Sequence, residues 1–162
     1  MYKILIVDDE RMIRMGIEKT INWKSLKIGE VYTAASAREA MEMIEKYKPN
    51  ILITDISMTE MSGLDLVGII REQESDMRII ILTGYDRFDY ARQALQLQVH
   101  DFLLKPIDER ELTESIRMQI QKIEEIKEEK QRTLNIKRTE GVYQQEYLES
   151  VIWDYMKDRK ST

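Results

Sequence analysis

The chain has 162 residues, 43% of them hydrophobic, which is enough for one domain of ordinary size plus an extension. Its 25 Lys and Arg residues against 30 Asp and Glu residues give a net charge of −5, which argues against a general attraction to nucleic acids. With no cysteine, the chain can form neither disulfides nor a thiolate metal site. No apolar run reaches the roughly 18 to 20 residues of a membrane span, and Met1 leads directly into a strand-like segment. We therefore expect a soluble, cytoplasmic protein with no membrane partner.

Short apolar runs predict five β-strands, at Lys3–Val7, Val31–Ala34, Ile51–Thr54, Ile79–Leu82 and Phe102–Leu104. The first and fourth runs are apolar on both faces, which is typical of central strands in a parallel sheet covered by helices on both sides. The segments between the runs have the period of amphipathic helices, and parallel strands need such crossover helices. The pattern predicts a doubly wound α/β domain in which five parallel strands, in the flavodoxin-like order 2-1-3-4-5, alternate with five helices, the last of them extended.

Helix boundaries are also marked in the sequence. Ser36 with Glu39, and Asp108 with Glu111, have the spacing of capping boxes. A break is predicted at Gly141. After it, a second amphipathic stretch contains Tyr147, Leu148, Val151, Ile152 and Tyr155. We expect one domain at residues 1–125 and a helical linker or extension at 126–162, with the start of a truncated downstream region left open as a further interpretation.

The extension allows two interpretations. Ile116, Ile123 and Lys130 lie seven residues apart, as do Ile120, Lys127 and Leu134, so the predicted seam is apolar at first and charged later. This pattern favours at most a weak coiled coil with a second copy of the chain. A single solvated helix is the alternative.

Acidic residues follow two strands that are expected to be neighbours. Asp8, Asp9 and Glu10 follow the first strand, and Asp55 follows the third. One interpretation of Asp9 is a helix N-cap. In a doubly wound sheet, however, ligands bind beyond the carboxyl ends of the strands, where Asp8, Asp9 and Asp55 would meet. Such acids raise one another's pKa unless a cation lies among them, and oxygen ligands suit Mg²⁺. The pattern predicts a magnesium site.

The same rim of the sheet is expected to carry a hydroxyl and an ammonium group, because Thr83-Gly84 and Lys105-Pro106 end the fourth and fifth strands. Taken singly, Thr83-Gly84 is more often an ordinary turn and Lys105 a surface lysine; together with the acids they indicate a site. A carboxylate beside a divalent ion, a lysine and a hydroxyl could accept a phosphoryl group, because the cations neutralise charge on the phosphoryl oxygens. Gly84 would let the backbone approach that group closely.

Together these motifs resemble the receiver domains of bacterial two-component response regulators, over about residues 2 to 125. The resemblance rests on Ile4–Glu10, Asp55–Met58, Gly63, Thr83-Gly84 and Lys105-Pro106, in order and at family-like spacing. It implies that a partner histidine kinase phosphorylates Asp55, and that the chain is a phosphoacceptor and not an enzyme.

The resemblance also implies roles for the other site residues. Asp9, Asp55 and the backbone carbonyl of Ser57 would bind Mg²⁺ directly, and Asp8 would reach the ion through water. Thr83 and Lys105 would contact the phosphoryl group. Thr83 and Phe102 would form the conformational switch, and the Lys105–Pro106 bond would be cis.

Two further segments, Asn22-Trp23-Lys24 and Gly84–Ala91, resemble the YesN-like regulators, whose receivers precede AraC-type DNA-binding domains. This resemblance implies transcriptional control through a DNA-binding domain absent from this chain. Thr59 stands where the family usually has proline, which bears on the stiffness of the loop after Asp55.

Other classes of protein fit less well. A haloacid dehalogenase-type phosphatase wants a second aspartate where this chain has Ser57, and a flavin module would find its phosphate repelled by the acids of residues 8–10. A histidine phosphotransfer protein needs a histidine on an exposed helix, whereas His100 lies just before the fifth strand and is expected to be structural or solvent-exposed. The remaining alternative is a receiver-fold binding module that switches without phosphorylation.

Overall fold

The computed structural model describes residues 1–73, 75–84 and 88–161, and their side chains except those of 88–91, 139–152, 155 and 158–161. Its elements are β1 (Tyr2–Val7), α1 (Arg11–Thr20), η1 (Lys24–Leu26), β2 (Ile28–Ala34), α2 (Ala37–Tyr47), β3 (Ile51–Asp55), α3 (Gly63–Glu72), β4 (Arg78–Thr83), α4 (Phe88–Gln96), β5 (Asp101–Leu104) and α5 (Glu109–Ser161). Two sequence-based expectations lie outside what is described. They are residues 85–87 of the Gly84–Ala91 motif and the apolar side chains expected between Tyr147 and Tyr155.

The five strands form one parallel sheet in the order β2-β1-β3-β4-β5. The register places Val7 opposite Thr54 and Asp55 opposite Leu82, so β1, β3 and β4 end at the same rim. The predicted fold class is confirmed. The predicted second strand was too short, because β2 begins at Ile28, where the backbone already pairs with Tyr2.

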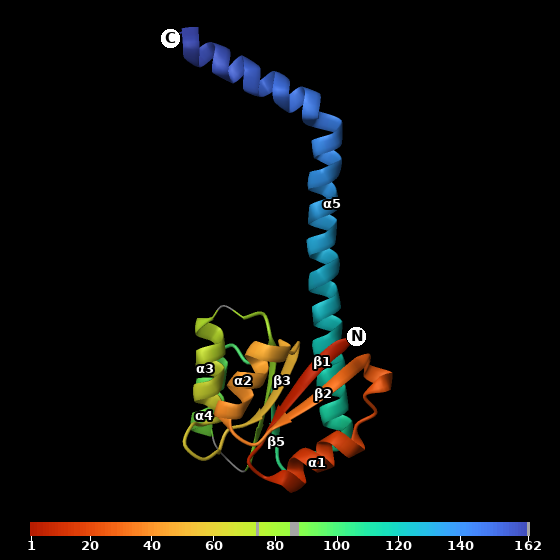
Figure 1. Cartoon of the computed structure of the whole chain (residues 1–162), viewed down its shortest axis with the longest axis vertical. Coiled ribbons are helices and arrows are strands. Elements are labelled where there is room, and N and C mark those ends of the chain that lie inside the picture. Colours follow the sequence, from red (N-terminus) through yellow and green to blue (C-terminus); the bar gives the residue numbers. More distant parts are fainter. Residues whose placement is uncertain (74, 85–87, 162) are drawn as a thin grey trace. The chain divides into compact units, whose positions relative to one another are not determined.

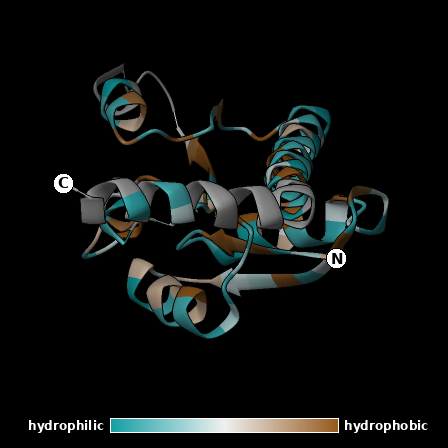
Figure 2. Ribbon diagram, turned by 90° about the horizontal axis from the view of Figure 1, so that it is seen from above, coloured by the Kyte–Doolittle hydropathy of each residue, from teal (hydrophilic) through white to brown (hydrophobic). Residues whose placement is uncertain are grey.

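Helices cover both faces of the sheet. Figure 1 shows α2, α3 and α4 gathered on one side, and α1 with the first turns of α5 on the other. Successive side chains of a strand point to opposite faces of the sheet, and here both faces are buried. Leu5 and Leu52 belong to the cluster with α2 and α3, and Ile4, the residue before Leu5, is equally buried. In Figure 2 brown, apolar segments are visible in the strands, and much of the helix surface is teal.

Side-chain caps begin three of the helices. Ser36 accepts a bond from the Glu39 backbone N–H at 3.1 Å, but Glu39 reaches back to Ala35 instead of to Ser36 itself. Asp108 accepts from the Glu111 backbone N–H at 3.3 Å, which confirms the second predicted cap. A full capping box, Ser62 with Asp65, was not predicted; it starts α3 beside the site described below.

The α5 helix contains Gly141, so the break predicted there is wrong. A glycine inside a helix costs only about 1 kcal/mol, which neighbouring helix-forming residues offset. The chain divides into two units, Met1–Ile120 and Gln121–Thr162. In the first, Leu112 and Ile116 of α5 are buried; in the second, Leu134 is half exposed. Within the described part of the chain, no helix is both long and apolar enough to cross a membrane.

Candidate functional site

Two central strands deliver buried carboxylates to one rim of the sheet. Asp8 directly follows β1 and is fully buried, and Asp55 ends β3 with 4% of its surface exposed. Because Val7 pairs with Thr54, the two acids come from neighbouring positions on adjacent strands. The predicted meeting of Asp8 and Asp55 is therefore present.

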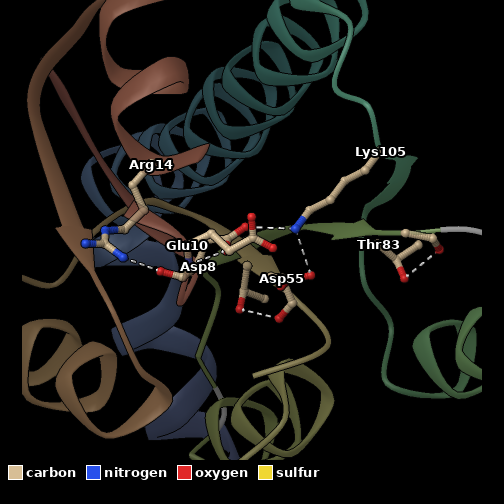
Figure 3. Close-up of polar contacts among 8 residues, drawn as sticks. Asp8, Glu10, Arg14, Asp55, Thr83 and Lys105 are labelled. Carbon is tan, nitrogen blue, oxygen red and sulfur yellow. Dashed lines mark hydrogen bonds and ion pairs between the residues drawn. The ribbon is translucent and has the colours of Figure 1, made fainter. Parts of the chain in front are cut away.

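Lys105, just after β5, is shared between these acids. Its Nζ lies 3.0 Å from Asp8 Oδ2 and 3.3 Å from Asp55 Oδ1, and only 17% of its side chain is exposed. Figure 3 shows the lysine extended across the rim with its ammonium group between the two carboxylates. Lys105 thus lies beside both acids and is mostly buried, unlike the surface lysine of the alternative interpretation.

The shared lysine does not neutralise two acids. Burial and the neighbouring charge of Asp8 raise the pKa of Asp55, and this effect exceeds the lowering by Lys105. Burial alone would lower the pKa of Lys105, but its hydrogen bond to Asp8 and the charges of both acids raise it overall. The lysine therefore stays protonated, and the site retains excess negative charge when both carboxylates are ionised.

Asp9 and Glu10 add to this excess. The carboxylates of Asp8, Asp9 and Glu10 offer oxygen atoms within 4.8 Å of one another, with Asp9 and Glu10 exposed to solvent. The N-cap of α1 is Glu10, so the interpretation of Asp9 as the N-cap is wrong. Carboxylate oxygens close together on an open rim fit a hard divalent cation that keeps part of its water shell. The donor set thus suits Mg²⁺.

Asp8 is held by more contacts than the sequence indicated. Its Oδ1 accepts from the Glu10 backbone N–H at 2.9 Å, and its backbone carbonyl accepts from Arg14 Nη1 at 2.6 Å. Sequence reasoning missed Arg14 because the contact spans a loop and has no characteristic spacing.

Gly63 supports the backbone of Asp55. A Cβ at position 63 would lie 1.9 Å from the Asp55 carbonyl oxygen, so no residue larger than glycine fits without a shift. The Gly63 N–H also donates to the Ile56 carbonyl at 2.9 Å, and Thr54 Oγ1 donates to the Asp55 carbonyl at 3.0 Å. The start of α3 is thereby pressed against the end of β3.

The remaining predicted residues lie around this centre. Thr83 is buried at the end of β4, where its hydroxyl donates to the Gly84 carbonyl at 3.2 Å. Phe102 is partly buried against the core. Ser57 is exposed in the loop after Asp55. The Lys105–Pro106 bond is cis, as the resemblance implied.

The loop that contains Thr59 turns without the usual proline. The Met61 N–H donates to the Thr59 carbonyl at 2.8 Å, across Glu60, which has a positive φ of 69°. The turn is thus closed by a backbone bond and anchored by Gly63 at its end.

His100 lies away from this rim, at the opposite end of the sheet. The imidazole Nδ1 accepts from the Ile79 backbone N–H at 2.9 Å, and the His100 backbone N–H donates to the Ile79 carbonyl at 2.8 Å. Burial, followed by the charges of Arg78 and Arg71, lowers the pKa of His100 to about 4. The histidine is structural, one of the two roles expected.

Comparisons with known proteins agree with this geometry. The family described as the response regulator receiver domain matches residues 4–117. An uncharacterised response regulatory protein of Staphylococcus epidermidis is 38% identical over 123 residues, which is 76% of this chain and 48% of that protein. The transcriptional regulatory protein HptR of Staphylococcus aureus is 40% identical over 112 residues, 69% of this chain and 44% of its own. The chain thus spans about half the length of these relatives.

Solved structures show the same likeness. The receiver domain of AraT, a response regulator from Geobacillus stearothermophilus, is 39% identical with a TM-score of 0.73, over 78% of this chain and 98% of that one. A two-component transcriptional regulator AraC from Clostridium phytofermentans is 34% identical with a TM-score of 0.70, over 75% and 94% of the two chains.

Proposed function

The chain belongs to the response regulator receiver domain family, and we propose that Asp55 accepts a phosphoryl group from a sensor histidine kinase in a Mg²⁺-dependent reaction. The observation that carries this proposal is the position of Lys105 between Asp8 and Asp55. Both carboxylate oxygens of Asp8 already accept bonds from within the chain, from Glu10 and Lys105. Asp55 is therefore the better candidate for the acceptor, and Asp8 for a supporting ligand.

Receiver domains bind Mg²⁺ at an acidic pocket, and here Asp9, Asp55 and the Ser57 carbonyl would hold the ion, with Asp8 acting through water. When bound, Mg²⁺ supplies positive charge that offsets the negative charge of the phosphoryl oxygens. This relieves the repulsion that raises the pKa of Asp55.

In the proposed transfer, an Asp55 carboxylate oxygen forms a bond to phosphorus while the bond from phosphorus to the kinase histidine breaks. Lys105 already lies 3.3 Å from Asp55, so it needs only a small movement to contact a phosphoryl oxygen. The Thr83 hydroxyl, now bonded weakly to Gly84, would turn to a second oxygen. The chain takes part in its own phosphorylation and dephosphorylation without being a classical enzyme.

Output would follow from the movement of Thr83. A reoriented hydroxyl leaves space into which Phe102 turns, which changes the surface of β5 and its neighbouring helices. The likeness to HptR and to the AraC regulator supports transcriptional control. We propose that this control acts through an AraC-type DNA-binding domain outside this chain, and that the protein works in the cytoplasm. We further propose that residues 1–125 form the receiver and 126–162 a linker.

The linker would also pair with that of a second copy. Leu134, which belongs to the predicted seam, is half exposed in the second unit, and a partner helix would cover it. Light scattering on residues 1–125 and 1–162, with and without a phosphoryl mimic, tests this. We expect dimers of the longer chain only; monomers throughout at tens of micromolar would leave the extension as a plain linker.

Intact-mass measurement tests the phosphorylation. After incubation with a small phosphodonor and Mg²⁺, we expect one added phosphoryl group on the wild-type chain and none on Asp55→Asn. Asp101→Asn, an aspartate at the opposite end of the sheet, is the matched control and should be labelled like wild type. Equal labelling of Asp55→Asn would contradict the assignment. No labelling of the wild type would favour the alternative, a binding module that switches without phosphate.

A further inference from the structure

Arg14 lies on α1 and extends back to the loop that joins β1 to α1. Its Nη1 donates to the backbone carbonyl of Asp8 at 2.6 Å, and its side chain is half-buried. Figure 3 shows the guanidinium beside the main chain of Asp8, on the far side of that residue from Lys105. We propose that Arg14 is a positioning residue that preorganises the carboxylates of Asp8 and Asp9 for Mg²⁺.

The bonded carbonyl is what gives Arg14 this reach. It belongs to the peptide unit between Asp8 and Asp9, which is planar. A bond that fixes the orientation of this plane also fixes the direction in which the backbone enters Asp9. The Asp9 side chain is exposed, so neighbouring side chains constrain it little. Its placement as a ligand therefore depends on its backbone.

Arg14 completes a set of bonds around Asp8. The Asp8 N–H donates to the Ala34 carbonyl at 3.2 Å, Oδ1 accepts from Glu10, and Oδ2 accepts from Lys105 at 3.0 Å. The Arg14 bond occupies the remaining polar atom of Asp8, its carbonyl oxygen. Unlike Lys105, Arg14 bonds to a backbone carbonyl in this set and takes up no carboxylate oxygen that a cation could bind.

The start of α1 lacks a side-chain cap, so the Arg14 bond is an additional contact that holds this loop. The N-cap residue Glu10 makes no side-chain capping bond, so the loop is not fixed by the usual device. The Glu10 carbonyl accepts the first intrahelical bonds of α1, from the backbone N–H groups of Ile13 and Arg14. The same residue, Arg14, thus anchors the loop through its backbone on one side and its side chain on the other.

Positioning and charge make opposite predictions for this residue. Removing a cation near an Mg²⁺ site strengthens Mg²⁺ binding through charge alone. Removing a group that orients metal ligands weakens binding, typically by about 10- to 100-fold. The sign of the change therefore separates the two roles.

Calorimetric titration of the 162-residue chain with Mg²⁺ measures that sign. We expect Arg14→Met to raise the Kd for Mg²⁺ by about tenfold. Arg14→Gln, which is too short to reach the Asp8 carbonyl, should do the same and serves if the first variant does not fold. Arg11→Met removes the same charge from an exposed position one turn earlier on α1 and should leave the Kd unchanged or slightly lower. In metal-free protein, the NMR amide signals of Asp9 and Glu10 should move in the Arg14 variants, while that of His100 stays.

The phosphorylation rate is a further measurement, which separates a change in Mg²⁺ affinity from a general loss of stability. At saturating Mg²⁺, the phosphorylation rate of Arg14→Met should return to within about twofold of wild type, because Arg14 does not contact Asp55. Mg²⁺ binding by Arg14→Met that is as tight as wild type, or tighter, overturns the inference while the proposed function stands. The inference rests on that proposed function, so a wild-type chain that binds no Mg²⁺ would remove both.

Discussion

At the carboxyl end of the sheet two buried carboxylates share one lysine, whereas at the amino end one arginine donates to several backbone carbonyls. The guanidinium of Arg71 bonds to the carbonyls of Leu97, Gln98, Ser75 and Met77 at 2.9 to 3.3 Å. It thereby joins the loop before β4 to the loop before β5. Nearby, Arg78 Nε donates to Gln119 of α5 at 2.9 Å.

The two ends of the sheet differ in whether their charged groups are fully compensated within the chain. The cation of Arg71 meets neutral acceptors at fixed positions, so its bonds are complete without any ligand. At the opposite rim, burial and Asp8 raise the pKa of Asp55, which means that the ionised form is disfavoured until more positive charge arrives. One end stabilises the fold, and the other keeps an unfavourable charge arrangement that a cation relieves.

The largest effect is expected from Arg71→Met. Loss of the guanidinium leaves partly buried carbonyls without donors, which should lower the free energy of unfolding by about 4 kcal/mol. Urea unfolding measures this, with Arg92→Met, an exposed arginine on α4, as control. If the two ends of the sheet are independent, the folded Arg71→Met variant should bind Mg²⁺ with the same Kd as wild type. Altered Mg²⁺ affinity would break the comparison.

Acid should weaken the amino end next. The pKa of His100 falls from 6.5 to about 4 on folding, mainly because of burial. Between these values the unfolded chain binds a proton that the folded chain does not, so the free energy of unfolding decreases as pH falls from 6.5 to 4. The loss is roughly 3 kcal/mol at most. His100→Gln should have a smaller slope over this range, and an unchanged slope would assign the effect to other groups.

Asp55→Asn should change stability in the other direction. Since the ionised carboxylate is disfavoured by burial and by Asp8, the neutral amide should raise the free energy of unfolding by about 1 kcal/mol at neutral pH without metal. Added Mg²⁺ should stabilise the wild type and leave the variant unchanged, as judged by thermal unfolding. A destabilised variant would mean that the pair with Lys105 outweighs the repulsion.

The smallest stability change is expected from Thr83→Ala. Its hydroxyl makes one long bond, to Gly84, so its removal should cost about 0.5 to 1 kcal/mol. We expect the variant to accept the phosphoryl group but to show smaller NMR shifts in β5 on phosphorylation than wild type. Thr83→Ser keeps the hydroxyl and is the control. Shifts in Thr83→Ala equal to those of wild type would remove Thr83 from the switch.

Much of the fold was predictable because it depends on local composition. Runs such as Ile79–Leu82 are short, rich in β-branched residues and apolar on both faces, which favours a central strand, and the spacing of the runs leaves room for crossover helices. The ends of elements were less accurate where pairing decides them. Ile28 joins β2 through its register with Tyr2, a contact that no local pattern reveals.

The site divides in the same way. Asp8, Asp55 and Lys105 were predictable because strand ends meet at one rim in this topology. Arg14 and the steric role of Gly63 were not, since each depends on a backbone carbonyl that passes nearby in space. Contacts to main-chain atoms place few demands on the partner's residue type, so the sequence carries little trace of them.

The register between β1 and β3 also has a consequence for chimeric proteins. The pairing of Val7 with Thr54 sets the separation of Asp8 and Asp55 through backbone hydrogen bonds and not through the segment that connects the strands. Residues 15–49 form most of α1, and all of η1, β2 and α2. Their polar contact with the acid pair is the bond from the Asp8 N–H to the Ala34 carbonyl. We expect that this segment can be exchanged for its counterpart from a related receiver without a change in the spacing of Asp8 and Asp55. The exchange should keep Arg14 together with β1 from the original chain.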